Sequence, residues 1–164
     1  MKDYLKYSGI LLGLIILQRT VVSFIDVTEF SVTPDLVIIG VVYYAIKRGK
    51  IHGTIAGFAS GLILDIFSFS FIGLMALSKT IAGFAAGFFY DEQKTERLLN
   101  SYLFVLIVSI CSIINNAVYY GFYFQGTKLA FLDILIRYVL PTTVYTALFS
   151  VVPVIFARKR RFAR

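Results

Sequence analysis

The sequence predicts an all-α polytopic membrane protein, a single-domain bundle of six transmembrane helices. Of its 164 residues, 59% are hydrophobic and 15% are charged, whereas a soluble domain carries about 45–50% apolar and about 25% charged residues. The apolar residues also form long uncharged runs, among them residues 101–124 and 138–157. A protein in water needs a charged surface that such runs cannot supply, so the pattern indicates burial in lipid.

The length of the chain limits the number of crossings. A hydrocarbon core about 30 Å thick needs about 20 helical residues per crossing, so six crossings fit into 164 residues only if the loops are short. The apolar runs are separated by short polar segments. We therefore predict helices over residues 5–24, 33–46, 51–67, 74–90, 99–124 and 132–157.

The individual helices differ in how clearly the sequence marks them. The first resembles a signal peptide, but Gln18 and Arg19 follow its apolar run where a cleavage site would need small residues, so we predict a retained span. The second is short, and the third and fourth are close enough in sequence to form an antiparallel hairpin. The sixth contains Pro141, which should kink it, and the hydroxyls of Thr142 and Thr143 should bond the freed backbone groups.

The basic residues predict the orientation of the bundle. They precede the first helix, follow the sixth and occupy the second and fourth connections: Lys2, Lys6, Lys47, Arg48, Lys50, Lys94, Arg97, Arg158, Lys159, Arg160, Arg161 and Arg164. The opposite loops hold Asp26, Glu29 and Lys128. Because short cytoplasmic loops retain Lys and Arg, we expect both termini in the cytoplasm. This role explains the net charge of +7 without a nucleic-acid partner, and anionic lipid adds a favourable contact.

Small residues line one face of the third predicted helix. Positions 53, 56, 57, 60 and 61 share that face, and the fourth helix repeats the pattern toward its end; the small residues with an expected packing role are Gly53, Gly57, Ser60, Gly61, Gly83 and Gly87. Such a surface lets another helix approach closely and gain dispersion contacts in lipid. We expect it to dock a helix of another protein.

Charged residues inside or near the apolar runs predict a second feature. A charge in the centre of a membrane helix costs about 2.5–3.5 kcal/mol on insertion scales and usually faces protein. In the predicted hairpin Asp65 and Lys79 come to similar depth, and we expect them to pair, with Arg19 and Asp35 completing a buried charge cluster. Asp133 and Arg137 lie toward the same side; for these two, separate extension to the membrane interface is the favoured interpretation.

The remaining polar residues indicate no catalytic chemistry. Asn115 and Asn116 lie within the fifth helix, where hydrogen bonding between helices is the favoured interpretation over lining a cavity. His52 is the only histidine, and alone it makes neither a metal site nor a catalytic triad. Cys111 lies in an apolar run and suits a small buried residue. We expect no enzyme activity, no catalytic residues, no metal and no cofactor.

The order of several motifs resembles the rod shape-determining protein MreD family. The residues that carry the resemblance are Gly57-Phe58-x-x-Gly61-x-x-x-Asp65, preceded by Gln18, Pro34-Asp35-Leu36 and Tyr43-Tyr44, and followed by Ser68, Ser70, Gly73 and Leu77. The match is firmest over residues 34–73. Lys79 and Arg19 match no position of the family pattern, so the expected charge pair rests on this sequence alone.

The resemblance implies a place in a cellular machine. Members belong to the bacterial inner-membrane machinery that elongates the lateral wall, together with MreC, the actin-like MreB, the glycosyltransferase RodA and its transpeptidase partner. They are similar in fold to the substrate-binding subunits of energy-coupling-factor vitamin transporters and have no known catalytic residues. We therefore expect a scaffold that docks the transmembrane helix of MreC. The alternative is a small-molecule binding subunit of a transporter, motivated by the fold similarity and by Asp35, Asp65, Asn115 and Tyr119.

Overall fold

The computed structural model describes residues 2–25, 33–68, 71–126 and 130–162, and all regular elements in these ranges are helical. Asp26, Glu29, Ser70, Lys128 and Arg164, used in the sequence interpretation, lie outside the described residues. The elements are α1 (Lys2–Ile25), α2 (Leu36–Arg48), α3 (Lys50–Ser68), α4 (Leu74–Ala86), the 3-10 turn η1 (Gly87–Phe89), α5 (Thr95–Leu99), α6 (Tyr102–Tyr123), α7 (Phe131–Ile134), the π-helical η2 (Leu135–Val139) and α8 (Leu140–Phe162). The all-α prediction is confirmed.

The predicted helices correspond to the observed ones with small shifts. The predicted fifth helix corresponds to α6, which begins at Tyr102 rather than at residue 99 because Ser101 is extended and accepts a hydrogen bond from the backbone N–H of Leu103. The short α5 precedes it. The predicted second helix begins three residues later than expected, at Leu36, behind the cap Asp35. Side chains at both new starts satisfy backbone N–H groups that have no partner within the helix.

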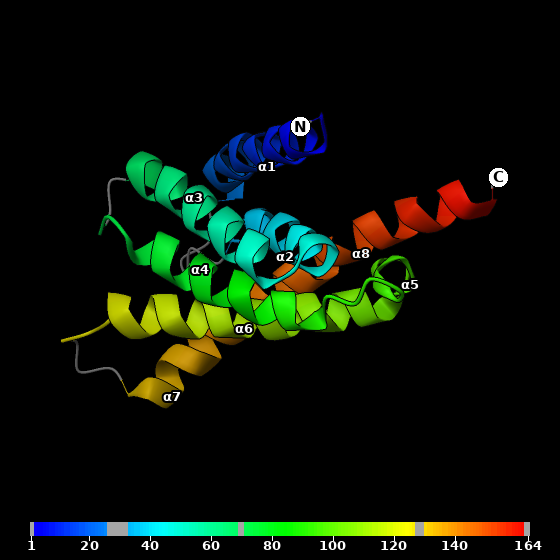
Figure 1. Ribbon diagram of the computed structural model, residues 1–164. Coiled ribbons are helices and arrows are strands. Elements are labelled where there is room, and N and C mark those ends of the chain that lie inside the picture. Colours follow the sequence, from blue (N-terminus) through cyan, green and yellow to red (C-terminus); the bar gives the residue numbers. More distant parts are fainter. Residues whose placement is uncertain (1, 26–32, 69–70, 127–129, 163–164) are drawn as a thin grey trace.

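The helices run back and forth along one direction, so that the bundle has two ends (Figure 1). One end holds the start of α1, the end of α8, α5 and the α2–α3 connection; we call the other end, where α3 ends and α4 begins, the distal end. Lys47 at the first of these ends lies 3.9 Å from Glu96 of α5. The basic connections thus share an end with both termini, which is the arrangement that the charge pattern predicts.

Three stretches of the described chain are long and apolar enough to cross a membrane by length and composition: Lys50–Ser68, Tyr102–Tyr123 and Phe131–Ile155. Gly9–Thr20 and Leu74–Phe89 are shorter apolar helices. The number of six crossings, and the side on which the termini lie, remain predictions.

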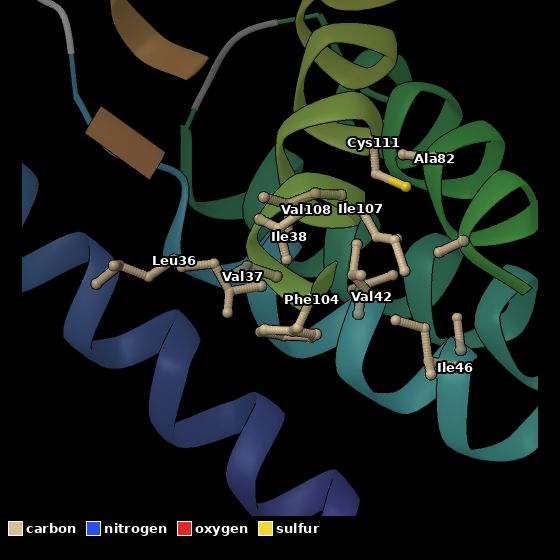
Figure 2. Close-up of a cluster of buried hydrophobic side chains, with 14 of the residues drawn as sticks. Leu36, Val37, Ile38, Val42, Ile46, Ala82, Phe104, Ile107, Val108 and Cys111 are labelled. Carbon is tan, nitrogen blue, oxygen red and sulfur yellow. The ribbon is translucent and has the colours of Figure 1, made fainter. Parts of the chain in front are cut away.

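The core of the bundle is built around α2. Nine of its 13 residues are buried, and Val37, Ile38, Val41 and Val42 have no exposed surface. Figure 2 shows how Val37, Ile38 and Val42 meet Phe104, Ile107, Val108 and Cys111 of α6 and Ala82 of α4. A helix of 13 residues is about 20 Å long, which is shorter than α1, α3 and α6. Because α2 begins short of the distal end, space remains between its N-terminus and that end.

The helix is irregular just before Pro141, where the sequence predicts a kink. The turn directly before it, η2, is π-helical, and a wider turn relieves the clash between a proline ring and the carbonyl group four residues earlier. The Thr142 hydroxyl donates to the Tyr138 carbonyl at 2.7 Å, and the Thr143 hydroxyl to that of Val139 at 2.7 Å. The hydroxyls thus bond carbonyl groups of the turn before Pro141, although the carbonyl that this proline leaves without an α-helical donor is that of Arg137.

Candidate functional site

The small residues of α3 lie against α4 of the same chain. A Cβ atom added at Gly61 would come within 2.5 Å of the Cα atom of Ala76, and one at Gly57 would clash with the Lys79 carbonyl. One at Gly53 would lie 2.5 Å from the carbonyl oxygen of Gly83. Close backbone approach is the use that such a surface has in lipid.

The rest of this seam is also filled from within. An added Cβ at Gly83 would clash with Gly53 and one at Gly87 with Lys50. Ser60 is buried and donates to the Gly57 carbonyl at 3.2 Å. The packing role of these residues is therefore explained, but the expectation that this face docks a helix of another protein is wrong, because α4 occupies it.

Asp65 caps the beginning of α4. Its carboxylate oxygens accept hydrogen bonds from the backbone N–H groups of Gly73 at 2.9 Å, Met75 at 3.0 Å and Ala76 at 3.0 Å. Asp65 has no exposed surface. The first N–H groups of a helix lack partners within it and carry partial positive charge, so a carboxylate there satisfies both requirements. Asp65 thus fixes the α3–α4 connection.

Lys79 pairs with Asp35, and the expected pair with Asp65 is wrong. The Lys79 ammonium donates to Oδ2 of Asp35, and the side chains are 3% and 11% exposed. Lys79 lies more than one helical turn beyond the start of α4, which brings it level with the recessed start of α2. Asp35 Oδ1 also caps α2 by accepting from the Ile38 N–H at 3.1 Å.

Arg19 does not join the buried charges, so the predicted cluster of four is wrong. Its side chain is exposed, and Nη2 donates to the Phe67 carbonyl at the end of α3 at 2.6 Å. A guanidinium is favourable at a helix C-terminus, where carbonyl groups lack partners. Asp133 and Arg137 are also exposed, in agreement with the separate positions favoured from the sequence.

Asn115 and Asn116 connect the ion pair to α8. Asn115 Nδ2 donates to Asp35 Oδ2 at 3.3 Å and to Asn116 Oδ1 at 3.1 Å. Asn116 Nδ2 donates to the Thr143 hydroxyl at 3.3 Å, and the Asp35 N–H donates to the Thr146 hydroxyl at 3.0 Å. The predicted hydrogen bonding between helices is confirmed, and the network joins α2, α4, α6 and α8.

A polar cavity lies between this network and the distal end. Its volume is about 460 Å³. Five helical segments and the residues before α2 line it: Gln18, Thr33, Asp35, Met75, Ser78, Lys79, Asn115, Asn116, Tyr119, Tyr120, Tyr123, Phe124, Tyr138 and Thr142. Gln18 of α1 accepts from the Val37 N–H at 2.9 Å and so helps to cap the recessed α2. Asn115 thus both forms hydrogen bonds between helices and lines a cavity, the two uses that the sequence left open.

The cavity was not predicted, although most of its polar residues were singled out. The sequence gives no distance between helices, and the cavity depends on the short α2. On the side away from the distal end, the apolar side chains of α2 and α6 shown in Figure 2 fill the bundle. The cavity is therefore a pocket that is closed toward the core. Among the described residues, no three His, Cys, Asp or Glu side chains gather as metal ligands.

The helical bundle, its apolar exterior and its buried polar network define a helical membrane protein with a pocket at one end. Comparison with known families is more specific. The family model of rod shape-determining protein MreD matches residues 5–159. The chain belongs to the MreD family. No curated protein and no solved structure matches it, so the expected similarity to transporter subunits stays a prediction.

Proposed function

We propose that the protein is a non-enzymatic scaffold of the bacterial cell-elongation machinery that docks MreC in the inner membrane. The observation that carries the proposal is the family match, which extends over residues 5–159 and thus over every helix of the bundle. The match supports a role in rod-shape determination. Docking of MreC, and through it of RodA and its transpeptidase partner, is our proposal for how that role is performed.

The contact with MreC should use a lipid-facing surface of the bundle. The α3–α4 seam is filled by the chain itself, so an outside helix must bind elsewhere. Large apolar side chains on several helices are available, such as Phe58, Phe84 and Leu148, which are 53%, 47% and 62% exposed. In lipid, association of helices depends on packing and hydrogen bonds more than on burial of apolar area, so exposure alone does not select one face.

The end that carries both termini should face the cytoplasm and meet MreB or anionic lipid. Lys47, Arg48, Lys94 and Arg97 gather at this end, together with the basic C-terminus. Basic residues near a membrane surface gain about 1 kcal/mol each from anionic lipid. The same charges could bind an acidic protein surface.

Co-purification tests the docking. The chain, carrying an affinity tag, is expressed with MreC of the same bacterium, extracted in mild detergent and purified; MreC should remain bound at a fixed ratio. A photo-crosslinking residue placed at position 58, 84, 113 or 148 then identifies the face. Loss of MreC from a folded protein, with no crosslink at any of these positions in the membrane, would refute the docking.

A further inference from the structure

We propose that the distal cavity binds an uncharged hydroxylated ring, such as a sugar or cyclic polyol, with Lys79 donating to it and Asn115 accepting from it. The ring could be free or form the headgroup of a lipid, since both present the same chemistry. The inference goes beyond the scaffold function, which needs no ligand. It rests on hydrogen-bonding groups of the cavity that the protein itself leaves unused.

The first of these groups is the side-chain carbonyl of Asn115. The amide orientation is fixed, because Nδ2 faces two acceptors, Oδ2 of Asp35 at 3.3 Å and Oδ1 of Asn116 at 3.1 Å. The carbonyl oxygen must therefore point elsewhere, and it has no hydrogen-bond partner although the residue is only 3% exposed. Buried acceptors are nearly always satisfied. A bound hydroxyl would supply the missing donor.

The second group is the ammonium of Lys79. An ammonium has three N–H donors, and in the described part of the chain Asp35 is the one acceptor bonded to it. Lys79 lines the cavity and is almost fully buried. Acceptor oxygens on a ligand would satisfy the remaining donors.

The charges of the cavity select an uncharged ligand. The carboxylate of Asp35 and the ammonium of Lys79 already neutralise each other. An anion would be attracted by Lys79 but repelled by the adjacent carboxylate of Asp35. A cation would be attracted by Asp35 but repelled by Lys79. In a site of low dielectric constant both arrangements are unfavourable relative to a neutral polar molecule.

The walls and size of the cavity suit a ring. The rings of Tyr119 and Tyr123 stack with their centroids 5.6 Å apart and an interplanar angle of 16°. The ring centroids of Tyr120 and Tyr138 are 5.4 Å apart. Aromatic faces accept the apolar C–H face of a sugar ring while its hydroxyl groups reach the polar side chains. The volume of about 460 Å³ falls in the range of about 300–1,000 Å³ that is usual for small-molecule sites.

The test uses the full chain in phosphatidylcholine nanodiscs. In the soluble arm, glucose and myo-inositol are titrated, and binding is measured by saturation-transfer NMR. Glucosamine and glucuronate are the charged comparators. In the lipid arm, nanodiscs with and without monoglucosyl diacylglycerol are compared by the unfolding temperature of the protein. Two variants probe the site: Asn115→Leu removes the free acceptor, and Tyr123→Ala removes a ring without touching the hydrogen-bond network. Ile113→Ala on the lipid-facing side of α6 is the matched control.

We expect a neutral ring to bind in at least one arm and both site variants to weaken it by about tenfold, with the control unchanged. A response to the soluble probes identifies a free ligand, and stabilisation by the glycolipid alone identifies a headgroup. Absence of a response in both arms overturns the proposal. So does equal binding by all variants, or tighter binding of the charged comparators.

Discussion

The carboxylate of Asp35 and the ammonium of Lys79 form a buried ion pair that joins the start of α2 to α4. The pair lies at the floor of the cavity and is bonded to Asn115, so one contact links the stability of the bundle to the shape of its pocket.

Replacing Lys79 by Met should lower the free energy of unfolding by about 3–5 kcal/mol, because Asp35 is left as an uncompensated buried charge. The combined Asp35→Asn and Lys79→Met variant removes both charges and retains an acceptor for the Ile38 N–H, so it should recover much of the loss. Unfolding of these two variants and of Asp35→Asn alone in mixed detergent micelles completes a double-mutant cycle. A Lys79→Met protein as stable as the parent would contradict the pairing.

Replacing Asp65 by Asn should destabilise the start of α4. One amide oxygen remains where two charged oxygens accepted three N–H groups, and unsatisfied buried donors cost about 1–3 kcal/mol. Hydrogen exchange should accelerate at Met75 and Ala76, whose amides bond Asp65. Asp133→Asn, at an exposed carboxylate, is the control and should change nothing. Unchanged exchange in Asp65→Asn would rule out the capping role.

Replacing Gly57 by Ala should destabilise the isolated protein, because the added methyl group meets the backbone of α4 at Lys79. Overpacking of a rigid contact costs about 1–3 kcal/mol. Gly121→Ala is the matched control, since its added methyl group meets no atom within 4 Å, and the better helix propensity of Ala should stabilise it by up to about 1 kcal/mol. If both variants unfold at the same point, the seam is not packed as described.

The predicted topology can be checked by labelling with a membrane-impermeant maleimide. A cysteine introduced at Ile72, between α3 and α4, should react in intact cells, and one at Glu92, between η1 and α5, should react only after permeabilisation. Both positions are exposed, whereas native Cys111 is fully buried and should give little background. The reverse pattern would place the termini outside.

The sequence predicted that α3 and α4 form an antiparallel hairpin, but neither that the small residues of α3 pack against α4 nor the register of that contact. Gly53 meets Gly83, Gly57 meets Lys79 and Gly61 meets Ala76, so each turn of α3 is matched by one turn back along α4. This register places Asp65 opposite the beginning of α4 and Lys79 a full turn away from it. Without the register, the simplest assumption is that Asp65 and Lys79 lie at equal depth in the membrane. That assumption predicts the wrong ion pair.

The cavity and the true partner of Lys79 depend on one further quantity, the depth at which α2 begins. The sequence predicts a short second helix, over residues 33–46, and α2 is a short helix of 13 residues. Whether a short helix tilts, thins the bilayer or begins inside the bundle depends on packing against its neighbours. Here it begins inside, behind Asp35. The polar residues of the site were therefore visible in the sequence, whereas the space they enclose was not.

The central claim, that this member of the MreD family maintains rod shape, is tested most directly by depleting the protein in its own bacterium and measuring the ratio of cell length to width. We predict that the cells widen and become round, and that the native chain supplied from a plasmid restores the rods. Cells that keep their length and width through depletion would contradict the proposed function.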